Sequence, residues 1–261
     1  MVDHGAETLT SKATVGSQDP GCAGAVDLRL AFAIVDVARE LARATPPPRG
    51  ASLFWLDSDA GYDLHALDVL CSRGIFRKYE FALQLGSGLG GKARWLAARS
   101  GCRVVGIDAR PSTVAAATLL NRRARMEEQV TFQVGRGDSL PLRPRAFTHV
   151  WIVDALGKDD ASLVFAEAFR VLRPGAQVAV HEEGGTRTRA EGLVRALHGT
   201  GFVDLEVREV PLADLPHTCQ VAQDRLRVAA QAWTDATAER VLARLSTRQA
   251  VALQIFGRRP S

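Results

Sequence analysis

The sequence predicts an α/β fold in which a mostly parallel sheet is covered by helices on both faces. From residue 81 onward, short runs rich in β-branched residues alternate with helical stretches, as is typical of parallel strands joined by crossover helices. A glycine-rich turn at residues 86–91 follows the first of these strands, at the kind of position where open α/β sheets bind ligands. With 261 residues and 46% hydrophobic content, the chain can bury the core of such a fold.

The part of the chain before residue 81 is predicted to be an addition to this fold. Residues 1–25 are small and polar and predict a flexible tail. Residues 26–43 carry apolar side chains at helical spacing, and the following "TPPPRG" ends the expected helix. Residues 51–80 are mixed and predict short helices. We therefore expect an N-terminal helical segment or lid at 26–80, followed by the main domain at 81–261.

The main domain is expected to contain seven strands. They are predicted at 81–85, 103–107, 130–134, 148–153, 176–180, 202–210 and 248–256. The helices between them are predicted at 91–100, 111–126 and 159–172, with a helical insertion at about 216–246. The "RPGA" that follows "FRVL" is a proline and glycine stop signal, so the third of these helices should end there.

Composition excludes several classes of protein. The net charge of +4 comes from arginines spread along the chain, without the basic block that a nucleic-acid-binding face favours. The amino terminus lacks an apolar leader, and the most apolar later run, "LRLAFAIVDVAREL", is interrupted by charges. The four cysteines are isolated, which predicts neither a metal site nor a disulfide framework. We therefore expect a soluble, cytoplasmic protein without metal, nucleic acid or membrane span.

The glycine-rich stretch "LQLGSGLGGKARWLAARSGCRVVGID" indicates a ligand that contains adenosine. Gly86, Gly88 and Gly90 or Gly91 allow a tight turn and a close approach of the backbone, and the amides at the following helix start favour an anionic group. Asp108 ends the second strand, where a carboxylate can accept hydrogen bonds from both hydroxyls of a ribose. The same spacing satisfies the dinucleotide pattern GxGxxG, so an NAD-dependent oxidoreductase stays open at this point.

A set of linked motifs decides between these ligands. "LQLGSGLGGKARWLA", "VVGIDARP", "VTFQVGRGDSLPL", "FTHVWIVDAL" and "EAFRVLRPGAQVAVHEE" occur in this order between residues 81 and 183. Together they resemble the class I S-adenosylmethionine-dependent methyltransferases, most closely the small-molecule branch with the sarcosine and dimethylglycine N-methyltransferases and the tocopherol-type enzymes. The resemblance implies a Rossmann-like, mostly parallel, seven-stranded sheet, S-adenosylmethionine as cofactor, and methyl transfer to N, O or C of a small metabolite.

The resemblance also implies which residues bind the cofactor. In this sequence the loop after the first strand would hold the methionine part, and the acid at the end of the second strand would bind the ribose. The segment after the third strand would contact the adenine, and the residues after the fourth strand would line the pocket. The residues are Gln84, Gly86, Ser87, Gly88, Gly90, Asp108, Ala109, Gly137, Asp138, Asp154 and Ala155.

Four positions depart from the family pattern. Gln84 stands where the first strand usually ends in an acid, and its amide oxygen can accept a hydrogen bond only without charge assistance. Arg136 stands where an acid contacts adenine, with Asp138 two places later, and Thr148 replaces the usual aspartate before the fourth strand. The histidine often found after that strand is missing, so the acceptor of the substrate proton is not in its common place.

Candidates for a catalytic proton acceptor are Tyr62, His65, His181, Glu182 and His217. His65 belongs to the expected lid, and His181 with Glu182 ends the fifth strand, at the edge where the site should open. A dedicated base is not required for an amine or an activated carbon, which can lose its proton before or after transfer.

Two other functions compete with small-molecule methylation. A protein that keeps the fold but acts as a cyclase or as a partner subunit would fit the four departures, and an oxidoreductase would fit the glycine loop alone. The apolar face of the helix expected at 26–43 could pack on its own domain or in a homodimer.

Overall fold

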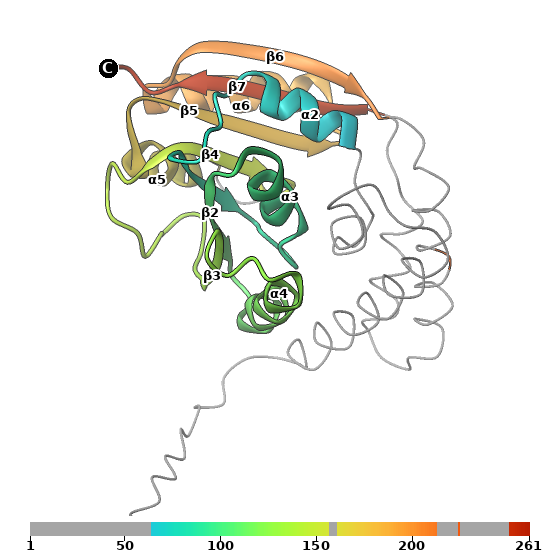
Figure 1. Cartoon of the computed structure of the whole chain (residues 1–261). Coiled ribbons are helices and arrows are strands. Elements are labelled where there is room, and N and C mark those ends of the chain that lie inside the picture. Colours follow the sequence, from blue (N-terminus) through green and yellow to red (C-terminus); the bar gives the residue numbers. More distant parts are fainter. Residues whose placement is uncertain (1–63, 157–160, 213–223, 225–250) are drawn as a thin grey trace, which may run out of the picture.

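The computed structural model describes residues 64–156, 161–212, 224 and 251–261, which contain one seven-stranded sheet flanked by helices (Figure 1). The strands are β1 (Phe81–Leu85), β2 (Arg103–Asp108), β3 (Val130–Val134), β4 (Phe147–Val153), β5 (Leu172–Glu183), β6 (Val203–Pro211) and β7 (Val251–Arg258). The described helices are α2 (Leu64–Ser72), α3 (Gly91–Ser100), α4 (Pro111–Ala124), α5 (Ala161–Val171) and α6 (Arg187–Thr200).

The order of the strands in the sheet is β3-β2-β1-β4-β5-β7-β6. Neighbours from β3 to β5 are parallel, whereas β7 lies antiparallel between β5 and β6. The chain runs from β1 outward to β3 and then returns to β4 on the other side of β1, so the strand order reverses between β1 and β4. The predicted mostly parallel α/β fold is confirmed, and the carboxyl ends of β1 and β4 meet at the ligand-binding switch point of such sheets.

Alternation of apolar side chains along the strands divides the core into two layers. On one face, Trp151 of β4 and Ala179 of β5 belong to a cluster with residues of α2 and α3. On the other face, Val150 and Val178 belong to a cluster with Phe165 of α5 and residues of α6. Because successive strand residues point to opposite faces, both faces of the central strands are apolar, as expected for a sheet covered on both sides.

Helix α6 was not predicted from the sequence. The Thr186 side chain accepts a hydrogen bond from Arg189 N (3.2 Å) at its start, and Gly201, at a φ of 103°, ends it. Its buried residues Ala190, Leu193 and Leu197 lie at helical spacing. The signal was therefore present, but the arginines before and between these residues, Arg187, Arg189 and Arg195, obscured it.

Strand β5 is longer than predicted. Helix α5 ends at Val171, close to the predicted stop, but β5 begins at once with Leu172 and includes the proline and glycine of "RPGA". Its pairing with β4 shifts register, from Phe147 opposite Leu172 to His149 opposite Gln177. A local irregularity of the strand accommodates residues that usually interrupt a regular ladder.

Several predicted segments lie outside the described residues. They are the tail at 1–25, the helix at 26–43, and the insertion at 216–246 except for Asp224. The division into a lid and a main domain therefore stays a prediction. Among the described helices, none has the length and apolar character needed to cross a membrane.

His149 of β4 is a buried histidine far from the expected ligand site. Its ring stacks on Phe76 with 4.1 Å between ring centroids, and its Nδ1 lies 3.0 Å from Thr148 Oγ1. Burial lowers the pKa of His149 from 6.5 to about 4. The folded protein therefore favours the neutral ring, which fits a structural role for this buried strand residue.

We expect His149 to make the protein less stable in mild acid. The unfolded chain binds this proton near pH 6.5 and the folded protein only near pH 4. The stabilisation is thus complete above pH 6.5 and is lost as the pH falls, by about 3 kcal/mol at pH 4. Urea unfolding at pH 7 and pH 4 should show this loss in the wild type and a smaller one in His149→Phe, which keeps the stacking. Equal losses in both proteins would contradict the assignment.

Candidate active site

The glycine loop after β1 approaches the chain after β4 more closely than other residues would allow. Gly86 has a φ of +67°, and a Cβ built there would lie 2.4 Å from Ala155 Cβ. At Gly90 a Cβ would lie 2.2 Å from the Phe132 ring, whereas at Gly88 it would meet nothing within 4 Å. The loop is therefore packed tightly at both ends and leaves open space in its middle, where a ligand can approach the backbone.

Two buried polar side chains at this loop are unsatisfied. Gln84 of β1 is 2% exposed and Ser87 is 5% exposed. In the part of the chain that the structure describes, neither amide atom of Gln84 nor the Ser87 hydroxyl has a hydrogen-bond partner. Buried polar atoms are nearly always paired in native proteins, so these three atoms indicate a polar ligand group between them. The ammonium and carboxylate of a methionine moiety fit this need.

Asp108 connects the loop to the end of β2. Its Oδ2 accepts a hydrogen bond from Gly88 N (3.1 Å), and its Oδ1 accepts one from Arg110 N (3.0 Å). The side chain is 11% exposed. Arg110 Nε also donates to Oδ1, over a longer 3.5 Å. Because a carboxylate offers about four acceptor positions, these three contacts leave a position on Oδ2 for a ribose hydroxyl. Ala109, which directly follows β2, lies between Asp108 and Arg110 in the chain.

The segment after β3, predicted to contact adenine, is organised by an ion pair. Arg136 donates from Nε (2.9 Å) and Nη2 (2.5 Å) to the two carboxylate oxygens of Asp138. These hydrogen bonds lower the pKa of Asp138. The charge of Arg136, which departs from the family pattern, is thus neutralised by the acid two places later. Gly137 lies between them, with a built Cβ 3.5 Å from Val164.

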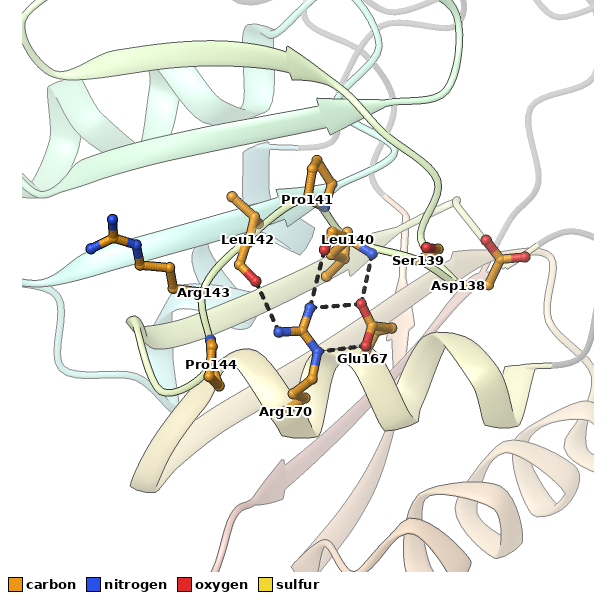
Figure 2. Close-up of a pocket in the computed structure, with 9 residues that line it drawn as sticks. All are labelled: Asp138, Ser139, Leu140, Pro141, Leu142, Arg143, Pro144, Glu167 and Arg170. Atoms are coloured by element: carbon orange, nitrogen blue, oxygen red, sulfur yellow. Dashed lines mark hydrogen bonds and ion pairs between the residues drawn. The ribbon is translucent and has the colours of Figure 1, made fainter.

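A pocket beside this segment is lined by Asp138, Ser139, Leu140, Pro141, Leu142, Arg143, Pro144, Glu167 and Arg170 (Figure 2). Glu167 accepts hydrogen bonds from Leu140 N (2.6 Å) and Arg170 Nε (2.6 Å), and Arg170 donates to the Leu142 carbonyl (2.8 Å). These bonds lower the pKa of Glu167, with the Arg170 side chain as the largest cause. The charged groups here hold the loop onto α5, so we assign this pocket a structural role.

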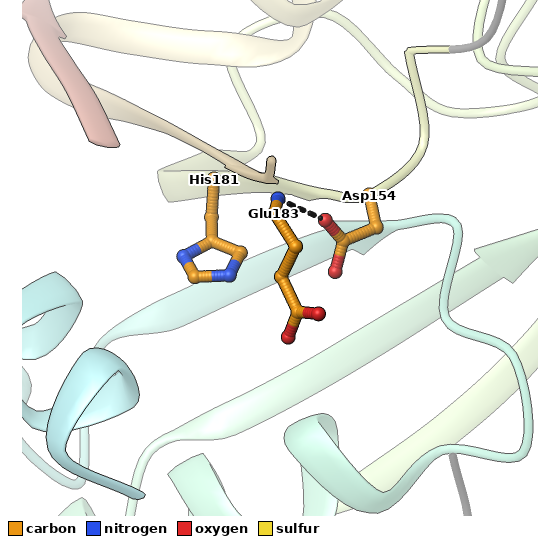
Figure 3. A group of neighbouring side chains, drawn as sticks. All are labelled: Asp154, His181 and Glu183. Atoms are coloured by element: carbon orange, nitrogen blue, oxygen red, sulfur yellow. Dashed lines mark hydrogen bonds between the residues drawn. The ribbon is translucent and has the colours of Figure 1, made fainter. Parts of the chain in front are cut away.

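Three side chains gather where β4 and β5 end (Figure 3). Asp154, at a φ of +50°, accepts a hydrogen bond from Glu183 N at Oδ1 (3.0 Å) and lies 3.6 Å from Lys92 Nζ through Oδ2. One carboxylate oxygen each of Asp154 and Glu183 and one ring nitrogen of His181 all lie within 4.8 Å of one another. A non-glycine residue in the left-handed region is often found at functional sites. The structure thus brings Asp154 and His181, both predicted site residues, together.

His181 is buried and contacts a residue that the sequence analysis missed. Its Nδ1 lies 3.2 Å from Nε2 of Gln254 in β7, and both side chains are buried. Gln254 is a polar residue in the otherwise apolar "VALQIF". That interruption was the available signal, but its partner could not be read from the sequence.

The remaining catalytic candidates lie away from this group or outside the described side chains. Glu182 accepts hydrogen bonds from Arg189 Nε (3.0 Å) and Nη2 (2.9 Å), so its carboxylate is directed toward α6. His65 belongs to α2, but its side chain is not described, and Tyr62 and His217 lie outside the described residues. His181 is thus the catalytic candidate that the described structure places beside another predicted site residue, Asp154.

The sheet order, the antiparallel β7, the glycine loop after β1 and the acid after β2 together define the class I methyltransferase fold. Residues 83–180 match a family model described as "Methyltransferase domain". This segment is a methyltransferase domain, and the methyl donor of the class is S-adenosylmethionine. The resemblance on which this fold was predicted is therefore confirmed.

Among curated relatives, the chain is 28% identical over 238 residues to erythromycin 3''-O-methyltransferase of Saccharopolyspora erythraea. The match covers 80% of this chain and 67% of the relative. Two further relatives are matched over only 54% and 30% of their own length. The chain thus spans between 30% and 67% of the length of these relatives.

Solved structures share the fold at low sequence identity. Phosphoethanolamine N-methyltransferase 2 of Haemonchus contortus, in complex with S-adenosyl-L-methionine, matches with a TM-score of 0.60 and 17% identity, over 86% of this chain and 60% of that one. The [4+2]-cyclase SpnF matches with a TM-score of 0.59 and 20% identity, over 88% and 93%. The fold is therefore shared by an N-methyltransferase and by a [4+2]-cyclase.

We expect Gln84→Met to separate cofactor binding from stability. Methionine has a similar shape and removes two unsatisfied buried atoms, so the free energy of unfolding of the cofactor-free protein should rise by about 1–3 kcal/mol. The affinity for S-adenosylmethionine should fall at least tenfold. Urea unfolding and calorimetric titration measure the two effects.

The matched control is Gln84→Glu, which restores the acid usual in the family. It should bind S-adenosylmethionine more tightly, because a charged acceptor faces the ammonium, and it should unfold more easily without ligand. Wild-type affinity in the methionine variant would show that Gln84 does not contact the cofactor.

Proposed function

We propose that this protein is a methyltransferase that transfers the methyl group of S-adenosylmethionine to N, O or C of a small molecule. The observation that carries the proposal is the group of buried, unsatisfied atoms of Gln84 and Ser87 beside the open middle of the glycine loop. Asp108, at the end of β2, accepts a hydrogen bond from Gly88 N in the middle of this loop and can hold a ribose. The Gln84 amide and the Ser87 hydroxyl thus match the amino acid end of an adenosyl amino acid, and the Asp108 carboxylate matches its ribose.

The residues of the site position the reactants. S-adenosylmethionine supplies an activated methyl group when bound, and in-line transfer then needs an acceptor held close to it with water excluded. Asp154 follows β4, and His181 lies near the end of β5, the strand that pairs with β4. Gln254, which contacts His181, also contacts Ala66 of α2. Asp154 and His181 are therefore assigned to the acceptor side of the site.

A small-molecule acceptor in the cytoplasm is the setting we propose. Erythromycin O-methylation in a relative supports a small acceptor, and the scattered arginines do not favour a nucleic acid. The homodimer considered for the helix at 26–43 remains a prediction, because that helix lies outside the described residues.

A non-methylating enzyme of the same fold is the second candidate. The similarity to the [4+2]-cyclase SpnF and the uncharged Gln84 favour it. Such a protein would bind S-adenosylmethionine without forming S-adenosylhomocysteine. An oxidoreductase would instead bind NADH.

Titration with S-adenosylmethionine, S-adenosylhomocysteine and NADH tests the proposal. We expect micromolar binding of the first two and none of NADH, and S-adenosylhomocysteine formation with a suitable acceptor. Asp108→Asn should weaken binding roughly 10- to 100-fold, because a charged acceptor is worth about 1.5–3 kcal/mol. The control Asp204→Asn, which alters a carboxylate bound by Arg258 at the far edge of the sheet, should bind like the wild type. Binding of NADH alone would contradict the proposal.

A further inference from the structure

The contact between His181 and Gln254 is set by strand pairing. In the antiparallel ladder of β5 and β7, His181 lies directly opposite Gln254. Gln254 is 0% exposed and His181 4% exposed. Cross-strand neighbours of this kind meet on one face of a sheet. The two side chains are therefore fixed relative to each other in a setting without bulk water.

The orientation of the Gln254 amide follows from its second contact. Its Nε2 donates a hydrogen bond to the Ala66 carbonyl of α2 over 2.7 Å. If the amide were turned, two acceptor oxygens would face each other at this distance, which is unfavourable. The second hydrogen of Nε2 is then available to His181 Nδ1 at 3.2 Å. Nδ1 accepts this bond, so the neutral ring carries its proton on Nε2.

This tautomer determines what the group at the ends of β4 and β5 can do. A divalent cation needs an unprotonated ring nitrogen, but Nδ1 is engaged by Gln254 and Nε2 carries the proton. The ring is instead a hydrogen-bond donor within 4.8 Å of the carboxylates of Asp154 and Glu183. A donor beside carboxylate acceptors suits a group that both accepts and donates a hydrogen bond, as a hydroxyl does.

We propose that the methyl acceptor is a hydroxyl oxygen, held by His181 Nε2–H, and that Gln254 is the positioning residue that fixes this donor. The inference rests on the proposed function and names its acceptor class. A hydroxyl oxygen has two lone pairs, so one can accept from His181 while the other attacks the methyl carbon. A neutral amine has one lone pair, which attack requires. The fixed N–H donor therefore favours oxygen over nitrogen.

The proton and electron balance of the step assigns a role to Glu183. As the acceptor oxygen forms its bond to the methyl carbon, the carbon–sulfur bond breaks and its electron pair stays on sulfur. The hydroxyl proton passes to the Glu183 carboxylate. Glu183 lies two residues beyond His181 and so on the same face of β5. Asp154 binds Glu183 N and lies beside Lys92, which makes it the group that holds Glu183 in place.

The first test is the tautomer itself, measured without turnover. In ¹⁵N-histidine-labelled protein with S-adenosylhomocysteine, the His181 signals, assigned with His181→Gln, should show a protonated Nε2 and an unprotonated Nδ1. Gln254→Glu should move the proton to Nδ1, because a carboxyl oxygen then faces it. Gln254→Met, which removes the donor at similar volume, should lose the fixed preference. A protonated Nδ1 in the wild type would overturn the proposal.

The second test is the choice of acceptor. A panel of glycosides and sterols with a free hydroxyl, each matched with its amino analogue, is assayed for S-adenosylhomocysteine. We expect turnover of hydroxyl compounds only, a roughly hundredfold lower kcat in Glu183→Gln, and an at least tenfold lower kcat in Gln254→Met with an unchanged KM for S-adenosylmethionine.

The outcomes separate the two proposals. Turnover of amines only, an unchanged kcat in Gln254→Met, or activity that requires Mg²⁺ and is lost with a chelator would overturn this inference and leave the methyltransferase function intact. Failure to bind S-adenosylmethionine would instead overturn the proposed function, and the tautomer measurement would still decide the role of Gln254.

Discussion

The close contact between Gly86 and Ala155 is the constraint on which the site depends. Parallel pairing of β1 with β4 places Leu85 beside Ile152, so both strands end at the same level. The two chains that leave them can remain together only because Gly86 has no side chain, since a Cβ would lie 2.4 Å from that of Ala155. Any larger residue would separate the cofactor loop from the chain that carries Asp154. The distance between the two halves of the site is thus fixed by backbone packing.

Four of the buried polar side chains lie near the carboxyl ends of the parallel strands or on the strand beside them. Gln84, Ser87, His181 and Gln254 are all buried, and all lie toward the carboxyl ends of the parallel strands or on β7 beside them. The two glutamines differ in their amide nitrogens. Gln254 Nε2 makes two contacts, whereas Gln84 Nε2 makes none within the described residues, and the amide oxygen of both residues has no partner there. Burying such groups costs stability. The unpaired atoms of Gln84 and Ser87 are therefore explained by ligand binding, and the contacts between Gln254 and His181 by the need to fix the orientation of the ring.

Local patterns were enough to predict most of the fold. All seven strands, the glycine loop and Asp108 follow from short apolar runs and turn residues, whose signal does not depend on distant partners. Helix α6 was missed because arginines interrupt its apolar face, and β5 was predicted too short because "RPGA" resembles a stop. The contact of Gln254 with His181 joins residues 73 positions apart. It depends on the register of the antiparallel β7, which no local pattern specifies.

The Ala66 carbonyl makes α2 part of the proposed acceptor site. Gln254 is oriented by this single main-chain oxygen, and His181 is oriented by Gln254. The orientation of Gln254, in the last strand of the domain, therefore depends on α2, which precedes the first strand. Both bonds are buried, so neither partner can exchange for water without opening the contact between α2 and the sheet. The packing of α2, which the sequence suggested only as part of a lid, thus also controls which nitrogen of His181 carries a proton.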